Sequence, residues 1–171
     1  MNKNEVLEFI QNNHFVLVGK PNSDYIYSGQ KAVASVNNHY LHNIDILFTV
    51  CPAITYQELL NKQLKNLKFI FCTSRVGYKR RQLLQELGFN SEVCKYYKFK
   101  PLSGLTAART LLEANCKSLE IIGMDNYYPR TIINQHDLIS CAKQWLHLRN
   151  NYNLTIDENM LKCVIYQSQQ G

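Results

Sequence analysis

The sequence predicts an α/β fold: a doubly wound, mostly parallel, Rossmann-like sheet flanked by helices, in a single domain over residues 1–171. Short apolar segments alternate with longer segments of helical periodicity, which is typical of parallel strands joined by crossover helices. The segment from His14 to Val18 is continuously apolar after its first residue, as strands buried on both faces usually are. With 171 residues, 46% hydrophobic and 19% charged, the chain has the size and composition of one globular domain.

In the first half of the chain, a short helix over 5–11 is expected before the strand over 14–18. Gly19 and Pro21 then interrupt the apolar run. Further apolar runs predict strands over 31–37, 44–50 and 67–72, with a helix over 56–64 between the last two.

In the second half, apolar spacing predicts a helix over 78–87, followed by Gly88 in the position that glycine favours after a helix. The next expected elements are a weak strand over 91–94, a helix over 104–115, the last firm strand over 119–122 and a long helix over 135–150. The final residues are expected to add a turn of helix near 157–162 and a short strand over 163–166.

The net charge of +6 and the pI of about 9.0 suit partners that carry negative charge, such as phosphates, nucleotides, nucleic acid or an anionic membrane surface. The densest basic run, Lys79-Arg80-Arg81, is explained equally well as a solvated helix face. The six cysteines form no CxxC pair, which argues against zinc, and most lie in apolar runs. Buried, reduced thiols and a polar N-terminus favour a cytoplasmic protein.

Polar residues follow two of the expected strands. Gly19, at the end of the first strand, lets the backbone approach a ligand, and Ser23 can meet phosphate oxygens. A plain strand terminator is the alternative reading of this turn. Asn37 and Asn38 follow the second strand, where their amides can bind a base edge or a ribose, or can serve only as turn residues.

A second group of polar residues surrounds the helix over 104–115 and the strand after it. Ser103 can cap this helix, and the free N–H groups of its first turn attract anions. Asp125 follows the strand and could bind a ribose hydroxyl, a substrate hydroxyl or a metal. Because the chain has no DxD motif, a metal site is not expected. His136 could act as a general base, because its unperturbed pKa is about 6.5.

Taken in order, the segments VGKPNS, VNNHY, LSG and GMDNY, with a later histidine ahead of a helix, resemble one known layout. They are similar to the GNGPS-type turn, the RxNxFY segment, the TSG turn and the GIDFY segment of small GT-A-like bacterial sialyltransferases. The best match covers 101–152. A related Rossmann-like group that includes pterin pyrophosphokinases shares part of this layout.

This resemblance implies a metal-independent glycosyltransferase that moves a sugar from a CMP-activated donor to a hydroxyl of a glycan or another acceptor. The donor is then a substrate, and no cofactor is expected. Tyr127 would assist the departing phosphate, and His136 would take the proton from the acceptor. Nucleotide contacts are implied for the strand-end residues Gly19, Asn22, Ser23, Asn37, Asn38, Ser103, Gly104 and Asp125.

The chain departs from the family pattern at Leu102, where a threonine is usual, and at Cys51, where an asparagine is usual. Two alternatives therefore stay open. One is a non-catalytic nucleotide-binding module of the same fold, whose basic surface meets nucleic acid or another protein. The other is a pyrophosphokinase-like transferase, which would need phosphates and Mg²⁺.

Overall fold

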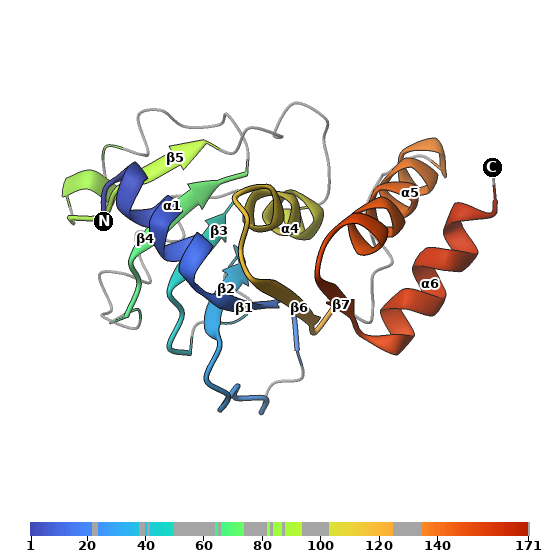
Figure 1. Ribbon diagram of the computed structural model, residues 1–171, viewed down its shortest axis with the longest axis horizontal. Helices are drawn as coiled ribbons and strands as arrows, with labels where there is room; N and C mark the ends of the chain where they lie inside the picture. The colour runs from blue at the N-terminus through green and yellow to red at the C-terminus, as the bar shows by residue number, and fades with distance from the viewer. Residues whose placement is uncertain are drawn as a thin grey trace.

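The computed structural model describes residues 1–21, 24–37, 40, 42–49, 64, 66–73, 82, 84–86, 88–93, 103–124 and 135–170, with the backbone alone for 92, 93 and 135–137. These residues form a seven-stranded sheet in the order β5-β4-β3-β2-β1-β6-β7, with helices packed against it (Figure 1). Every recorded strand pair is parallel. The predicted α/β, Rossmann-like fold is confirmed.

The strands of this sheet are short, and helices precede or follow several of them along the chain. The strands are β1 (His14–Val18), β2 (Ala32–Val36), β3 (Ile46–Thr49), β4 (Phe69–Cys72), β5 (Ser91–Val93), β6 (Ser118–Ile122) and β7 (Leu154–Ile156). The helices are α1 (Lys3–Asn12), α4 (Ser103–Glu113), α5 (Gln135–Asn151) and α6 (Glu158–Ser168).

Strand β1 lies inside the sheet, between β2 and β6, and its residues supply both faces of the core. Phe15 and Leu17 belong to the cluster on one face, and Val16 and Val18 to the cluster on the other. All four side chains are fully buried. Because both faces are covered, alternation of polar and apolar residues is absent, and the continuous apolar run of the sequence results.

The two faces of the sheet are covered differently. The larger cluster contains buried side chains of α1, α4, α5 and α6, and Figure 1 shows α1 and α4 in front of the strands. Trp145 of α5 is fully buried in this cluster. On the opposite face, the cluster covers β1 to β4 with Tyr40, Leu64 and Leu84. Over β6 and β7, by contrast, none of the described helices packs on that second face, and Thr155 is exposed there.

Polar contacts stabilise the start of α1 and the amino-terminal edge of the sheet. Helix α1 begins with a capping box, in which Asn2 Oδ1 accepts from Glu5 N at 3.0 Å and Glu5 Oε2 accepts from Asn2 N at 2.8 Å. Asp45, just before β3, accepts from Val33 N at 2.9 Å and forms an ion pair with Lys68. Asp45 therefore ties β2 to the residue that precedes β4, which gives this carboxylate a structural role.

Most predicted elements lie within a few residues of the observed ones, but the end of the chain differs. The strand predicted over 163–166 is wrong, because these residues lie inside α6. Strand β7, which the sequence analysis missed, precedes that helix. Asp157 sets the boundary, since its Oδ1 accepts from Asn159 N at 2.9 Å and from Met160 N at 3.3 Å.

Two predicted helices fall largely where the structure gives no description. The helix expected over 56–64 lies outside the described residues except for Leu64, which is not helical. Of the helix expected over 78–87, residues 82 and 84–86 are described, and all of them are helical. Gly88 follows with a φ of 86°, the left-handed conformation expected of a glycine after a helix.

The four described cysteines are buried or half-buried. Cys72 and Cys141 are buried, Cys116 and Cys163 are half-buried, and none of these four forms a disulfide. Burial raises the pKa of the Cys116 thiol to about 11, so this thiol stays protonated at neutral pH. Cys51 and Cys94 lie outside the described residues. Among the helices that the structure describes, none is both long and apolar enough to cross a membrane.

The substitution Leu111→Ala tests the packing of α4 on the sheet. Leu111 is fully buried in the larger cluster, so truncation should lower the free energy of unfolding by about 2–5 kcal/mol. Ile26→Ala is the control, since Ile26 is 61% exposed and its loss should change stability by no more than about 0.5 kcal/mol. Urea denaturation of both variants measures the difference, and equal midpoints would contradict the described packing.

Candidate functional site

The connectivity of the sheet marks one place where a ligand site is expected. From β1 the chain moves outward through β2, β3, β4 and β5, and then returns to the other side of β1 to form β6. The connections after β1 and β6 therefore leave in opposite directions, which makes the carboxyl ends of these two strands the topological switch point of the sheet. In open α/β sheets, ligands bind near such a switch point.

The turns after β1 and β6 are held together by backbone contacts. Gly19 N donates to Ile122 O at 2.8 Å, and Lys20 N donates to Gly123 O at 2.8 Å. Gly123 has a φ of 72°, and a Cβ placed there would lie 2.8 Å from Pro21 N. Only glycine fits this position without strain, so the two turns form one compact unit.

Met124 joins the first turn of α4 to this unit. Its side chain fills the space beside two glycines: a Cβ on Gly19 would lie 2.6 Å from Met124 Cγ, and a Cβ on Gly104 would lie 2.9 Å from Met124 Sδ. Gly19 and Gly104 are thus required for close packing. Contact of either with a ligand stays a prediction, because the packing alone explains both glycines.

Ser103, the first residue of α4, connects this site to β4. Its Oγ lies 3.3 Å from Thr73 Oγ1, which follows β4. The first turn of α4 therefore lies at the same edge of the sheet as the turns after β1 and β6. Free N–H groups at the start of a helix favour anions, so this edge suits a phosphate or a carboxylate.

The structure describes only part of the predicted site. Gly19, Ser103 and Gly104 come together as expected, and Asn37 directly follows β2 with a φ of 56°, a conformation that asparagine tolerates well. Residue His136 lies in the first turn of α5, but its side chain lies outside the described part. Also outside it are the predicted site residues Asn22, Ser23, Asn38, Asp125 and Tyr127.

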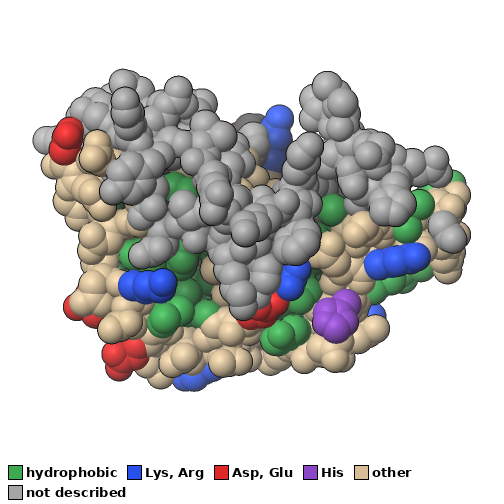
Figure 2. Space-filling model, turned by 90° about the horizontal axis from the view of Figure 1, so that it is seen from above, with side chains coloured by type: hydrophobic (Ala, Val, Ile, Leu, Met, Phe, Trp, Pro, Cys, Tyr) green, Lys and Arg blue, Asp and Glu red, His purple; other side chains and the backbone are tan. Residues whose placement is uncertain are grey.

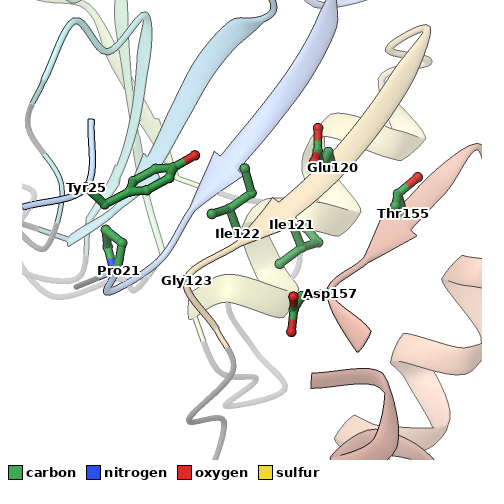
Figure 3. Close-up of a pocket in the computed structure, with 8 residues that line it drawn as sticks. All are labelled: Pro21, Tyr25, Glu120, Ile121, Ile122, Gly123, Thr155 and Asp157. Atoms are coloured by element: carbon green, nitrogen blue, oxygen red, sulfur yellow. The ribbon is translucent and has the colours of Figure 1, made fainter. Parts of the chain in front are cut away.

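A cavity of about 280 Å³ adjoins this edge, on the side of β6 and β7 that no described helix covers. Figure 3 shows Pro21 and Tyr25 on one side of it and Thr155 and Asp157, from β7 and its end, on the other, with β6 between them. We call it the β6–β7 cavity. Its lining residues are Pro21, Tyr25, Glu120, Ile121, Ile122, Gly123, Thr155 and Asp157.

The polar side chains of the β6–β7 cavity are acidic or carry a hydroxyl group. Glu120 Oε2 lies 2.6 Å from the Nζ of Lys31, and these two side chains are 36% and 38% exposed. Desolvation, followed by the nearby Tyr40, Glu120 and Tyr27, raises the pKa of Tyr25. The Tyr25 hydroxyl is therefore a neutral group that can donate a hydrogen bond at neutral pH.

The sequence analysis missed the polar residues of this cavity. Glu120 was the available signal, because a charged residue inside the apolar strand SLEII is unusual in a buried sheet. Thr155 and Asp157 gave no signal, since β7 itself was not predicted. Their grouping depends on strand pairing between segments that lie far apart in the sequence.

A second cavity, of about 250 Å³, is lined by Arg109, Gln144, His147 and Leu148 of α4 and α5. Its cation is already engaged, because Arg109 donates to Glu113 at 3.0 Å and to Gln144 at 3.2 Å. Figure 2 shows that, on the face it draws, the coloured Lys and Arg side chains lie apart from one another. The basic run of residues 79–81 lies outside the described residues.

Within the described ranges, no group of three or more His, Cys, Asp or Glu side chains could hold a metal ion. Comparison of the chain with protein-family models, with curated proteins and with solved structures gives no match.

The substitution Gly123→Ala tests the packing of the turns after β1 and β6, with Gly88→Ala as the matched control. Both glycines have a positive φ, which costs an alanine about 1–2 kcal/mol. At Gly88 a Cβ meets nothing within 4 Å, whereas at Gly123 it meets the backbone of Pro21. We expect Gly123→Ala to lower the free energy of unfolding by about 1–3 kcal/mol more than the control, and equal losses in urea denaturation would refute the close contact.

Proposed function

We propose that the protein binds a nucleotide at the carboxyl edge of its sheet and transfers a sugar from a CMP-activated donor to a hydroxyl acceptor. The observation that carries this proposal is the meeting of three segments at one edge. These are the turn after β1, the turn after β6 and the first turn of α4, which Met124 joins.

The proposal assigns the phosphates of the donor to the edge that these segments form. N–H groups at the start of α4 and the exposed Lys20 are the described groups that favour negative charge there. Asn37, which follows β2, is assigned to the nucleoside. Asn22, Ser23, Asn38 and Asp125 complete the nucleotide contacts in this proposal, on the strength of their positions in the sequence.

The transfer step needs a base for the acceptor hydroxyl and support for the leaving phosphate. We assign the base to His136 on the strength of its position in the sequence, because an imidazole is the side chain best suited to accept a proton near neutral pH. The hydroxyl oxygen of the acceptor then attacks the sugar carbon of the donor, while the bond from this carbon to the CMP oxygen breaks. Tyr127 would donate a hydrogen bond to the departing phosphate.

A thermal-shift screen with CMP, CDP, UDP, GDP and ATP tests the nucleotide site. A ligand present at a hundred times its Kd stabilises the native state by about 2.7 kcal/mol, which raises the Tm of a chain of this size by roughly 5–11 °C. We expect CMP to give this rise in the absence of a divalent metal. Ser103→Ala should weaken the response, whereas Ser168→Ala, which removes a hydroxyl that donates to Ile165 O, should not.

The other outcomes of the screen count against this proposal in different ways. A rise only with ATP or GDP and Mg²⁺ favours a pyrophosphokinase-like transferase. No rise with any nucleotide, combined with binding to DNA or RNA that weakens steeply with salt, favours a non-catalytic module with a nucleic-acid partner.

The substitution His136→Ala tests the assigned base. We expect sugar transfer from a CMP-sugar to fall by about 10²–10⁴-fold, while the shift in Tm with CMP stays as in the unmodified protein. His147→Ala is the control, because His147 is an exposed residue of the same helix and contacts Asn151. Full transfer activity in the His136 variant would remove His136 from the mechanism.

A further inference from the structure

We propose that the β6–β7 cavity binds a neutral, polyhydroxylated ring of the size of one pyranose. This inference rests on the proposed function for the role of that ring, which would be the acceptor sugar. The presence of the cavity and the chemistry of its walls do not depend on that role.

Strand pairing places the polar groups of the cavity side by side. In the parallel register of β6 and β7, Glu120 is the partner of Thr155, so their side chains stand on the same face of the sheet. Asp157 follows directly after Ile156, the partner of Ile121. Two carboxylates and a hydroxyl therefore line one wall (Figure 3).

Both carboxylates keep an oxygen available for a ligand. Glu120 uses Oε2 toward Lys31, and Asp157 uses Oδ1 to cap α6. Neither Glu120 Oε1 nor Asp157 Oδ2 has a hydrogen-bond partner among the described residues. Carboxylate oxygens accept hydrogen bonds strongly from ligand hydroxyls, while Tyr25 and Thr155 can both donate and accept.

The charge of the cavity discriminates between ligands. Two carboxylates line the cavity, and among the described residues Lys31 supplies the ammonium group that is paired with one of them. This excess of negative charge repels a phosphate or an acidic sugar, in contrast to the start of α4. A neutral ring with several hydroxyls satisfies the carboxylates without adding charge.

The size and the apolar wall of the cavity agree with a single ring. At about 280 Å³ it lies just below the usual range for ligand pockets, which begins at about 300 Å³. Ile122 and the ring of Tyr25 supply apolar surface for the C–H face of a sugar (Figure 3). Pro21 and Gly123 line the cavity and also belong to the turns at the carboxyl edge of the sheet, where the proposed function places the phosphates. A bound ring would therefore lie next to that edge.

The test is an amide NMR titration of the full chain with methyl β-D-galactopyranoside, with cytidine and with CMP, each added alone. We expect the galactoside to shift the amides of Glu120, Gly123 and Thr155 saturably. Glu120→Gln and Asp157→Asn should each weaken this binding by about tenfold. Asparagine still caps a helix well, so the Asp157 variant keeps α6, and urea denaturation of both variants checks folding.

Glu158→Gln is the matched control, because it makes the same change in charge on the surface of α6, outside the cavity lining. Its galactoside affinity should stay unchanged. If cytidine, and not the galactoside, shifts these amides with the same dependence on Glu120, the cavity belongs to the nucleoside of the donor, and the inference of a pyranose site is wrong.

Two results would overturn the inference. One is the absence of shifts at these amides with the galactoside up to its solubility limit. The other is saturation by Mg²⁺ or Ca²⁺ in place of the sugars. Galactoside binding without any response to CMP, by contrast, would refute the proposed nucleotide site and leave the sugar cavity in place.

Discussion

The pairing of β1 with β6 is the constraint on which the rest of the structure depends. It places a strand near the start of the chain beside one that follows α4. As a result, β1 has a hydrogen-bonded strand on each side. The same pairing continues past the strand ends as two backbone hydrogen bonds, from Gly19 N and Lys20 N. Because these turns touch, Met124 fills the space between Gly19 and Gly104. The arrangement of the candidate site therefore follows from one strand register.

Sequence patterns predicted those elements whose burial is complete or one-sided. The apolar run of β1 and the helical spacing of α4 identify their own structures, since each carries its periodicity within one segment. Strand β7 was missed because its three residues lie between two helices, too few for a pattern to emerge. In the site, Ser103 and Gly104 could be found from their position at the start of a helix. The cavity around Glu120 could not, because it depends on which strands pair.

The two halves of the candidate site have opposite electrostatic character. At the carboxyl edge, the start of α4 and Lys20 favour negative charge, whereas Glu120 and Asp157 give the neighbouring cavity an excess of carboxylate. Gly123 lies at the boundary between these two environments, since it packs on Pro21 and both residues line the cavity. A ligand that combined a phosphate with a neutral ring would match this division along its length.

The position of β1 also has a consequence for how the chain folds. His14 of β1 contacts Ser118 of β6 across 104 residues of sequence, so the loop that must close before the central strand has both neighbours is long. Long-range parallel pairing is slow to form, because the chain loses the entropy of the closed loop before the contacts between the strands can stabilise it. During synthesis, the edge of β1 that later meets β6 stays unpaired until more than a hundred further residues have emerged. Slow maturation and a need for protection against premature association with other chains are the expected results.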